Sequence, residues 1–99
     1  MTAYAIGFLK VHDPSWRAEY GARLPAVVAR HGGQILAGGG PQEVLEGRPP
    51  ASDAVVVLAF PDTERARDWY RDPDNAELVA LRQTGSTLDL LLIQGKETP

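Results

Sequence analysis

The chain has 99 residues, 43% of them hydrophobic and 23% charged, which is the composition of one ordinary globular domain with a single modest core. Its formal net charge is −3 and it has no block of lysine or arginine, so it lacks the basic patch that nucleic acids and anionic membrane surfaces require. The absence of cysteine excludes disulfides, thiolate nucleophiles and thiolate metal ligands.

The same features predict a cytoplasmic protein without a membrane partner. The first ten residues contain no basic leader, and their first lysine, Lys10, follows a strand-like run, which is not the pattern of a signal peptide. No apolar run approaches the ~20 residues that a membrane-spanning helix needs. A chain without cysteine also fits a reducing compartment.

The N-terminal third predicts a strand followed by a helix. Residues 2–11 are apolar in both phases of the strand period, which is typical of a strand covered on both faces. Asp13 is expected to cap a helix that begins at Pro14, and Gly32 is expected to end it in the left-handed conformation. Pro25 lies inside the helical pattern, where its ring presses on the carbonyl of residue 21, so a kink or a short break is expected there.

The middle of the chain predicts two further strands joined by a long loop. Residues 34–37 form the first of these strands, and residues 54–60 form the second, which is apolar on both faces. Between them, residues 38–41 contain three glycines but lead into Pro41 instead of a helix N-terminus, and they lack the lysine of a phosphate loop. We interpret them as a bend at a strand end, followed by a loop or hairpin-like excursion over residues 42–53.

The C-terminal part predicts two short helices and a last strand. Asp62 can cap the first helix, whose apolar stripe consists of Ala66, Trp69 and Tyr70. Pro73 suits the first position of a second helix that runs to about Arg82. Residues 86–94 then form a strand that is apolar on both faces except for Asp89. We expect one domain over residues 1–95 and a loose tail over residues 96–99.

The order strand, helix, strand, strand, helix, strand is the ferredoxin-like βαββαβ pattern. It predicts an α+β fold with a four-stranded antiparallel sheet and its helices on one face. Three strands are apolar on both faces, and the helices can cover only one of them. A second copy of the chain is the simplest cover for the other face, so the sequence predicts a homodimer.

Several short motifs occur in an order and spacing that resemble a known family. They are residues 31–39 (HGGQILAGG), Leu45-Glu46-Gly47, Phe60-Pro61-Asp62, Trp69-Tyr70, Leu81-Arg82 and Ile93-Gln94-Gly95. Together they resemble the family called domain of unknown function 1330, a branch of the dimeric α/β-barrel superfamily. The resemblance implies two ferredoxin-like protomers that pair sheet to sheet into a barrel. Relatives in the superfamily include cofactor-free monooxygenases, muconolactone-isomerase-like enzymes and haem-degrading proteins, but the family has no assigned reaction to carry over.

Two positions depart from the family pattern. The family often has an arginine where this chain has Ala37, and a basic residue is common where this chain has Ser52-Asp53. If those basic residues bind an anion in other members, this chain has lost that means of doing so. We expect no cofactor.

Asp89 and His12 are the candidate catalytic residues. Histidine transfers protons near neutral pH, so His12 and His31 are candidate general bases, although each also has a structural explanation at the end of an element. Asp89 lies in phase with Leu91 in an apolar strand, and carboxylates in such places cluster at functional sites. The alternative is that Asp89 reaches water or an arginine such as Arg82. Two histidines so far apart, without a third ligand, predict no metal site.

Tyr20, Trp69 and Arg82 are the candidate ligand-binding residues. Each also has a structural interpretation, the aromatic residues as core and Arg82 as a cation at a helix end or an ion-pair partner. The sequence therefore leaves two hypotheses. One is a small cofactor-independent enzyme that acts on an apolar or aromatic metabolite, and the other is a non-catalytic homodimeric module that binds a ligand or serves a structural role.

Overall fold

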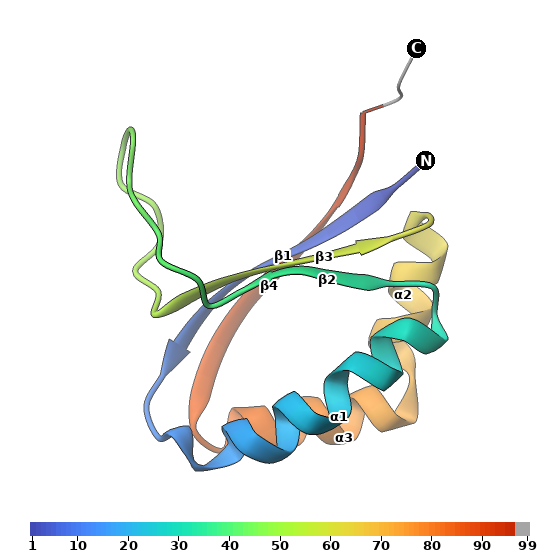
Figure 1. Ribbon diagram of the computed structural model, residues 1–99, viewed down its shortest axis with the longest axis horizontal. Coiled ribbons are helices and arrows are strands. Elements are labelled where there is room, and N and C mark those ends of the chain that lie inside the picture. Colours follow the sequence, from blue (N-terminus) through green and yellow to red (C-terminus); the bar gives the residue numbers. More distant parts are fainter. Residues whose placement is uncertain (97–99) are drawn as a thin grey trace.

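The computed structural model describes residues 1–96 and shows a four-stranded antiparallel sheet with its helices on one side (Figure 1). In chain order the elements are β1 (Ala3–Val11), the 3-10 helix η1 (Pro14–Trp16), α1 (Arg17–Arg30), β2 (Gln34–Gly38), β3 (Ala54–Phe60), α2 (Thr63–Arg71), α3 (Pro73–Gln83) and β4 (Ser86–Gln94). The strands lie side by side in the order β2-β3-β1-β4, which confirms the ferredoxin-like α+β fold. Residues 97–99 of the expected tail lie outside the described residues.

The strand register separates the two faces of the sheet. On one face Leu9 of β1 lies opposite Ala54 of β3 and Leu88 of β4. On the other face Ile6 lies opposite Val57 and Leu91. Since successive side chains of a strand point to opposite faces, these pairs assign the positions of β1, β3 and β4 either to the face that the helices cover or to the opposite face. The expected apolar character of both phases is confirmed.

An aspartate side chain caps the N-terminus of each of η1, α2 and α3. Asp62 Oδ1 accepts a hydrogen bond from the backbone N–H of Arg65 at 2.8 Å, and Asp72 Oδ1 accepts one from the N–H of Asp74 at 2.9 Å. Asp13 accepts from the N–H and from the hydroxyl of Ser15, and these two hydrogen bonds hold the pKa of Asp13 below its usual value. Asp13 caps η1, and α1 begins only at Arg17.

Of the kink or short break expected at Pro25, the break does not form, and the kink stays a prediction. α1 is continuous from Arg17 to Arg30, although Pro25 cannot donate a helical hydrogen bond. Residues on both sides of Pro25 pack into the core, Leu24 before it and Val28 after it, and this packing stabilises both halves of one helix. The helix ends as expected, because Gly32 adopts a φ of +74° that favours glycine.

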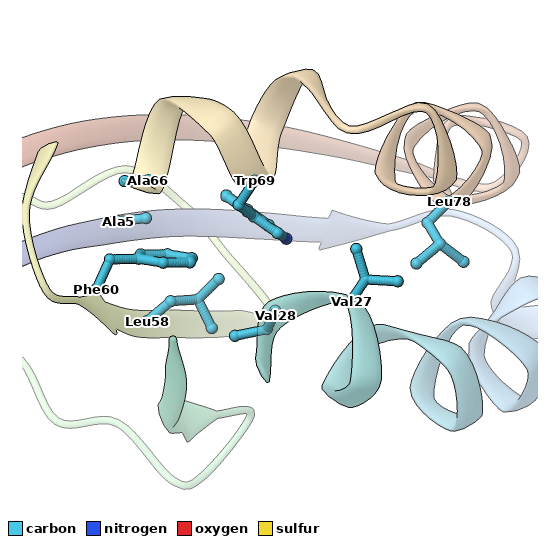
Figure 2. Packing of buried hydrophobic residues seen from close by; sticks show 8 residues of the cluster. All are labelled: Ala5, Val27, Val28, Leu58, Phe60, Ala66, Trp69 and Leu78. Atoms are coloured by element: carbon cyan, nitrogen blue, oxygen red, sulfur yellow. The ribbon is translucent and has the colours of Figure 1, made fainter. Parts of the chain in front are cut away.

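The core lies between the helices and the sheet, and Figure 2 shows its side chains pointing into this space. The buried cluster consists of Ala5, Val27, Val28, Leu58, Phe60, Ala66, Trp69 and Leu78. Phe60 and Trp69 pack with ring centroids 5.2 Å apart. Gly33 is required here, because a Cβ at this position would approach the Phe60 ring and Val28 to within 2.8 Å. Tyr70, expected in the same apolar stripe, is instead about half exposed.

The face of the sheet opposite the helices is uncovered (Figure 1). Its apolar side chains on β1, β3 and β4 are Tyr4, Ile6, Phe8, Val55, Val57, Ala59, Leu91 and Ile93. Leu91 and Ile93 are about half exposed. We call this surface the open face.

The loop between β2 and β3 extends away from the body of the protein (Figure 1). Gly39 opens it with a φ of +95°, and no helix follows the three glycines, which confirms a bend at a strand end. Leu45 on this loop is 88% exposed. Among residues 1–96 no helix is long and apolar enough to cross a membrane.

Candidate functional site

A cavity of about 260 Å³ lies between the helices and the sheet. Its floor is formed by the helix side of the strands, including Leu9, Val56 and Leu90. Its walls come from all the helices and contain Trp16, Tyr20, Leu24, Trp69, Asn75, Val79 and Arg82. The cavity is therefore assembled from residues that lie up to 81 positions apart in the sequence, from Leu9 to Leu90.

One wall is aromatic. Trp16 of η1 and Tyr20 of α1 lie one helical turn apart and pack edge to face, with ring centroids 5.3 Å apart and an interplanar angle of 85°. Trp69 reaches the cavity from α2. An aromatic wall of this kind suits a flat apolar ligand.

Arg82 is the cation of the cavity wall. It lies in the last turn of α3 and is only 5% exposed. Within residues 1–96 its guanidinium forms neither an ion pair nor a hydrogen bond, and its Nε atom is fully buried without a partner. The suggested pairing of Arg82 with Asp89 is wrong, because Arg82 lies on the helix side and Asp89 lies on the open face.

Three other residues of the wall also keep a buried polar atom without a hydrogen bond. They are Trp16 through Nε1, Trp69 through Nε1 and Asn75 through Oδ1. The Nδ2 atom of Asn75 lies 3.5 Å from the backbone oxygen of Tyr70, to which it donates. Buried polar groups in proteins are normally satisfied, so four such residues around one cavity are an unusual concentration.

The rest of the wall is mainly apolar. Among the described residues that line the cavity there is no carboxylate and no histidine. Arg17, which is exposed, adds a second cation at the rim. The described part of the site thus has donors and positive charge but no anionic group to pair with them.

The structure brings together the three residues predicted to bind a ligand. Tyr20, Trp69 and Arg82 all line the cavity, although they come from three different helices. Their role stays a prediction. Sequence reasoning missed Asn75, whose signal is its position in the buried stripe of α3, seven residues before Arg82.

The two candidate catalytic residues lie outside the cavity. Asp89 is exposed and lies opposite Phe8 on the open face. His12 is exposed at the end of β1, and its Nε2 atom lies 3.0 Å from the hydroxyl of Thr87. The structure therefore does not place either residue beside the predicted ligand-binding residues.

His31, the other histidine considered, belongs to a cluster that joins two helices. Its Nε2 donates to Asp72 Oδ2 at 2.7 Å, and Arg30 Nη1 lies 2.9 Å from both Asp72 and Asp74. The hydrogen bond from His31, followed by that from the N–H of Asp74, holds the pKa of Asp72 below its usual value. The cluster ties the end of α1 to the start of α3, which is a structural role.

A second hollow of about 420 Å³ lies between α2 and the edge strand β4. It shares Trp69, Tyr70 and Leu90 with the cavity, and Arg67 and Arg71 lie along it. Despite its larger volume it carries none of the unpartnered groups except Trp69. We therefore place the candidate site in the cavity. Within residues 1–96, no three residues of the types His, Cys, Asp and Glu are grouped to hold a metal ion.

The fold defines a small α+β protein of the ferredoxin-like class, with a cavity between its helices and its sheet. The chain belongs to the family described as domain of unknown function (DUF1330), whose model matches residues 2–96. This match confirms the family expected from the sequence motifs. No functionally curated protein matches the chain.

Solved structures show the same fold at low sequence identity. A protein of unknown function from Rhodopseudomonas palustris is 20% identical, with a TM-score of 0.76 over 98% of this chain and 84% of that chain. SnoaB, a cofactor-independent oxygenase from Streptomyces nogalater, is 17% identical, with a TM-score of 0.63 over 98% and 95%. A dimeric ferredoxin-like protein of unknown function from Thermobifida fusca is 11% identical, with a TM-score of 0.54 over 95% and 91%.

Proposed function

We propose that this protein is a cofactor-independent enzyme that acts on a small, apolar or aromatic metabolite held in the helix–sheet cavity. The observation that carries the proposal is the cavity itself. It is apolar and aromatic on most of its surface, and four of its residues, Trp16, Trp69, Asn75 and Arg82, each keep a buried polar atom without a hydrogen-bond partner in residues 1–96. An apolar pocket with a few convergent polar groups is the usual form of a small-molecule site.

The wall residues have distinct roles in this proposal. Trp69 and Tyr20 contact the apolar body of the metabolite, and Arg82 binds its polar end. A buried cation stabilises negative charge that develops on a substrate oxygen more strongly than an exposed one, because little water competes with it. The similarity to the cofactor-independent oxygenase SnoaB supports the reaction class by analogy of fold.

A second candidate function is a non-catalytic module that binds the same class of ligand. It is favoured by the absence of a carboxylate or histidine among the described cavity residues. A reaction that needs a general base would have to draw on His12 or Asp89, and both lie elsewhere. The two candidates share the binding step and differ in turnover.

Binding and turnover can be tested in turn. A library of small aromatic and alicyclic metabolites is screened by thermal shift, and each hit is incubated in air and analysed for product by mass spectrometry. Val79→Phe, which fills the cavity, should abolish the thermal shifts, whereas Ala80→Phe on the exposed side of the same helix should leave them unchanged. Hits that persist in Val79→Phe would contradict the cavity as the site, and hits without product would favour the binding module.

We further propose that two copies of the chain pair through the open face. The face carries eight apolar side chains on β1, β3 and β4 alone, and a sheet of this size offers on the order of 800 Å² to a partner, the area of a standard specific interface. The description of the Thermobifida fusca neighbour as dimeric supports this proposal. Sedimentation at micromolar concentration should show a species of twice the chain mass, and a folded monomer there would contradict it.

A further inference from the structure

Arg82 has a position that a purely structural role does not explain. A long arginine at a helix end can complement the helix dipole while its charged head reaches water. Here the side chain is instead buried in the cavity wall, and its guanidinium has no anionic partner within residues 1–96. Burying an uncompensated charge is costly, so the free protein is destabilised at this position.

The other unpartnered groups around the cavity complement one kind of ligand. The indole N–H groups of Trp16 and Trp69 can only donate, and Arg82 can only donate. The three donors belong to residues of η1, α2 and α3 that line one cavity, which has no carboxylate among its described residues. Only an acceptor can satisfy them, and an anionic oxygen satisfies the charge as well.

Asn75 contributes an acceptor, which requires a hydrogen-bond donor on the ligand. Its amide nitrogen donates to the backbone oxygen of Tyr70, which leaves Oδ1 as an acceptor without a donor. A hydroxyl on the ligand would satisfy it. The volume of about 260 Å³ limits the ligand to roughly one ring with small substituents.

We propose that Arg82 and the indole N–H groups of Trp16 and Trp69 form an anion subsite that binds the carboxylate or enolate oxygen of a one-ring organic acid, whose hydroxyl donates to Asn75. This inference rests on the ligand-binding part of the proposed function and names the substrate class. The bound acid gives the buried Arg82 charge its missing partner.

The test compares ligands that differ in charge. Cyclohexanecarboxylate, its neutral amide, 2-hydroxycyclohexanecarboxylate and the enolate of 1,3-cyclohexanedione are titrated into the protein by calorimetry at pH 7. Quenching of the two tryptophans, both of which line the cavity, gives a second readout for the probes that do not absorb. The carboxylate should bind about tenfold or more tightly than its amide, since hydrogen bonds to charged groups are the strong ones. Preference for the carboxylate or for the enolate identifies which oxyanion the subsite takes.

Two variants assign the preference to residues. Arg82→Gln should reduce the ratio of carboxylate to amide affinity to about one, whereas Arg65→Gln, an exposed arginine of α2 outside the cavity, should leave it unchanged. The 2-hydroxyl should strengthen binding about two- to tenfold, and Asn75→Leu should remove that gain.

The results separate this inference from the proposed function. Equal binding of the carboxylate and the amide by the unaltered protein would overturn the anion subsite, while the cavity would stand as a binding site for neutral ligands. An undiminished preference in Arg82→Gln would also overturn it. If Arg82→Gln does not fold, the comparison in the unaltered protein still decides the question. No binding by any probe overturns the inference, and no hit in the wider metabolite library would overturn the proposed function as well.

Discussion

The two faces of the sheet are both apolar, but their polar residues differ in kind. The helix side collects buried donors and the guanidinium of Arg82, which has no ion-pair partner within residues 1–96. The open face carries an exposed carboxylate, Asp89, among apolar side chains. The helix side therefore fits the anion pocket that we propose, whereas the open face fits the interface that we propose between two copies.

This difference shows that apolar periodicity alone does not identify the face of a sheet that carries a ligand site. Both phases of β1 and β3 have the same hydrophobic pattern, and only the surroundings differ. Each face can be altered separately, because neighbouring residues of one strand point to opposite sides. Substitutions on the two faces should therefore have different effects.

The largest effect is expected from a charge placed on either face of β3. Leu58→Asp buries a carboxylate in the core and should cost more than about 4 kcal/mol, which leaves no folded protein. Val57→Asp places the same charge on the open face and should give unfolded or aggregated protein if a second copy covers that face. Circular dichroism and sedimentation distinguish the outcomes. A soluble folded monomer of Val57→Asp would show that the open face needs no partner.

A cavity in the core should have the next largest effect. Leu78→Ala removes most of a fully buried side chain at the packing centre of α3 and should lower the free energy of unfolding by about 2–5 kcal/mol. Leu45→Ala on the exposed loop is the matched control and should change it by less than about 0.5 kcal/mol. Urea unfolding measures both. A comparable loss at Leu45 would mean that a partner covers the loop.

Removal of the unpaired charge should stabilise the protein. Arg82→Met keeps an apolar side chain of adequate length and eliminates the buried guanidinium without a partner, so the free energy of unfolding should rise on the order of 1 kcal/mol. Thermal unfolding without ligand measures the change. A fall in stability would show that Arg82 serves the fold, against the role given to it in the cavity.

Acid should weaken the link between α1 and α3. The pKa of Asp72 is lowered in the folded protein, so its stabilisation is fully present above the unfolded value of about 3.9 and is lost as the pH falls through the folded value. Asp72→Asn retains a good helix cap but removes the charge. The stability difference between the unaltered protein and this variant should therefore be constant near pH 7 and shrink towards pH 3. A difference that does not change with pH would mean that the charge of Asp72 contributes nothing.

The smallest effect on ligand binding is expected from Asp89→Asn. Asp89 lies on the open face, so binding in the cavity should change by less than about twofold, and the oligomeric state should not change. Calorimetry with a ligand identified by the screen measures the affinity. If this variant instead loses turnover, the reacting groups lie between the two open faces of a dimer. The functional site would then be on the open face and not in the cavity on the helix side.

The sequence by itself determined most of the fold. Period-two and period-3.6 patterns, together with Asp62, Pro73 and Gly32 at helix ends, predicted nearly every element and their order, because these signals act within a few residues. The break at Pro25 was wrong for the opposite reason. Contacts of Leu24 and Val28 with residues distant in the chain stabilise the helix across a local breaker, and no local rule includes them.

The candidate site was only partly predictable. Tyr20, Trp69 and Arg82 were singled out as residue types, but only the packing of three helices on the sheet placed them around one cavity. It was also the tertiary structure that separated Asp89 from Arg82, added Asn75 and left Arg82 without a partner. Periodicity gives the phase of a residue within its own strand or helix, and it does not give the side of the sheet to which the helices pack. That side is set by the connections between elements, and so it was decided only when the whole chain folded.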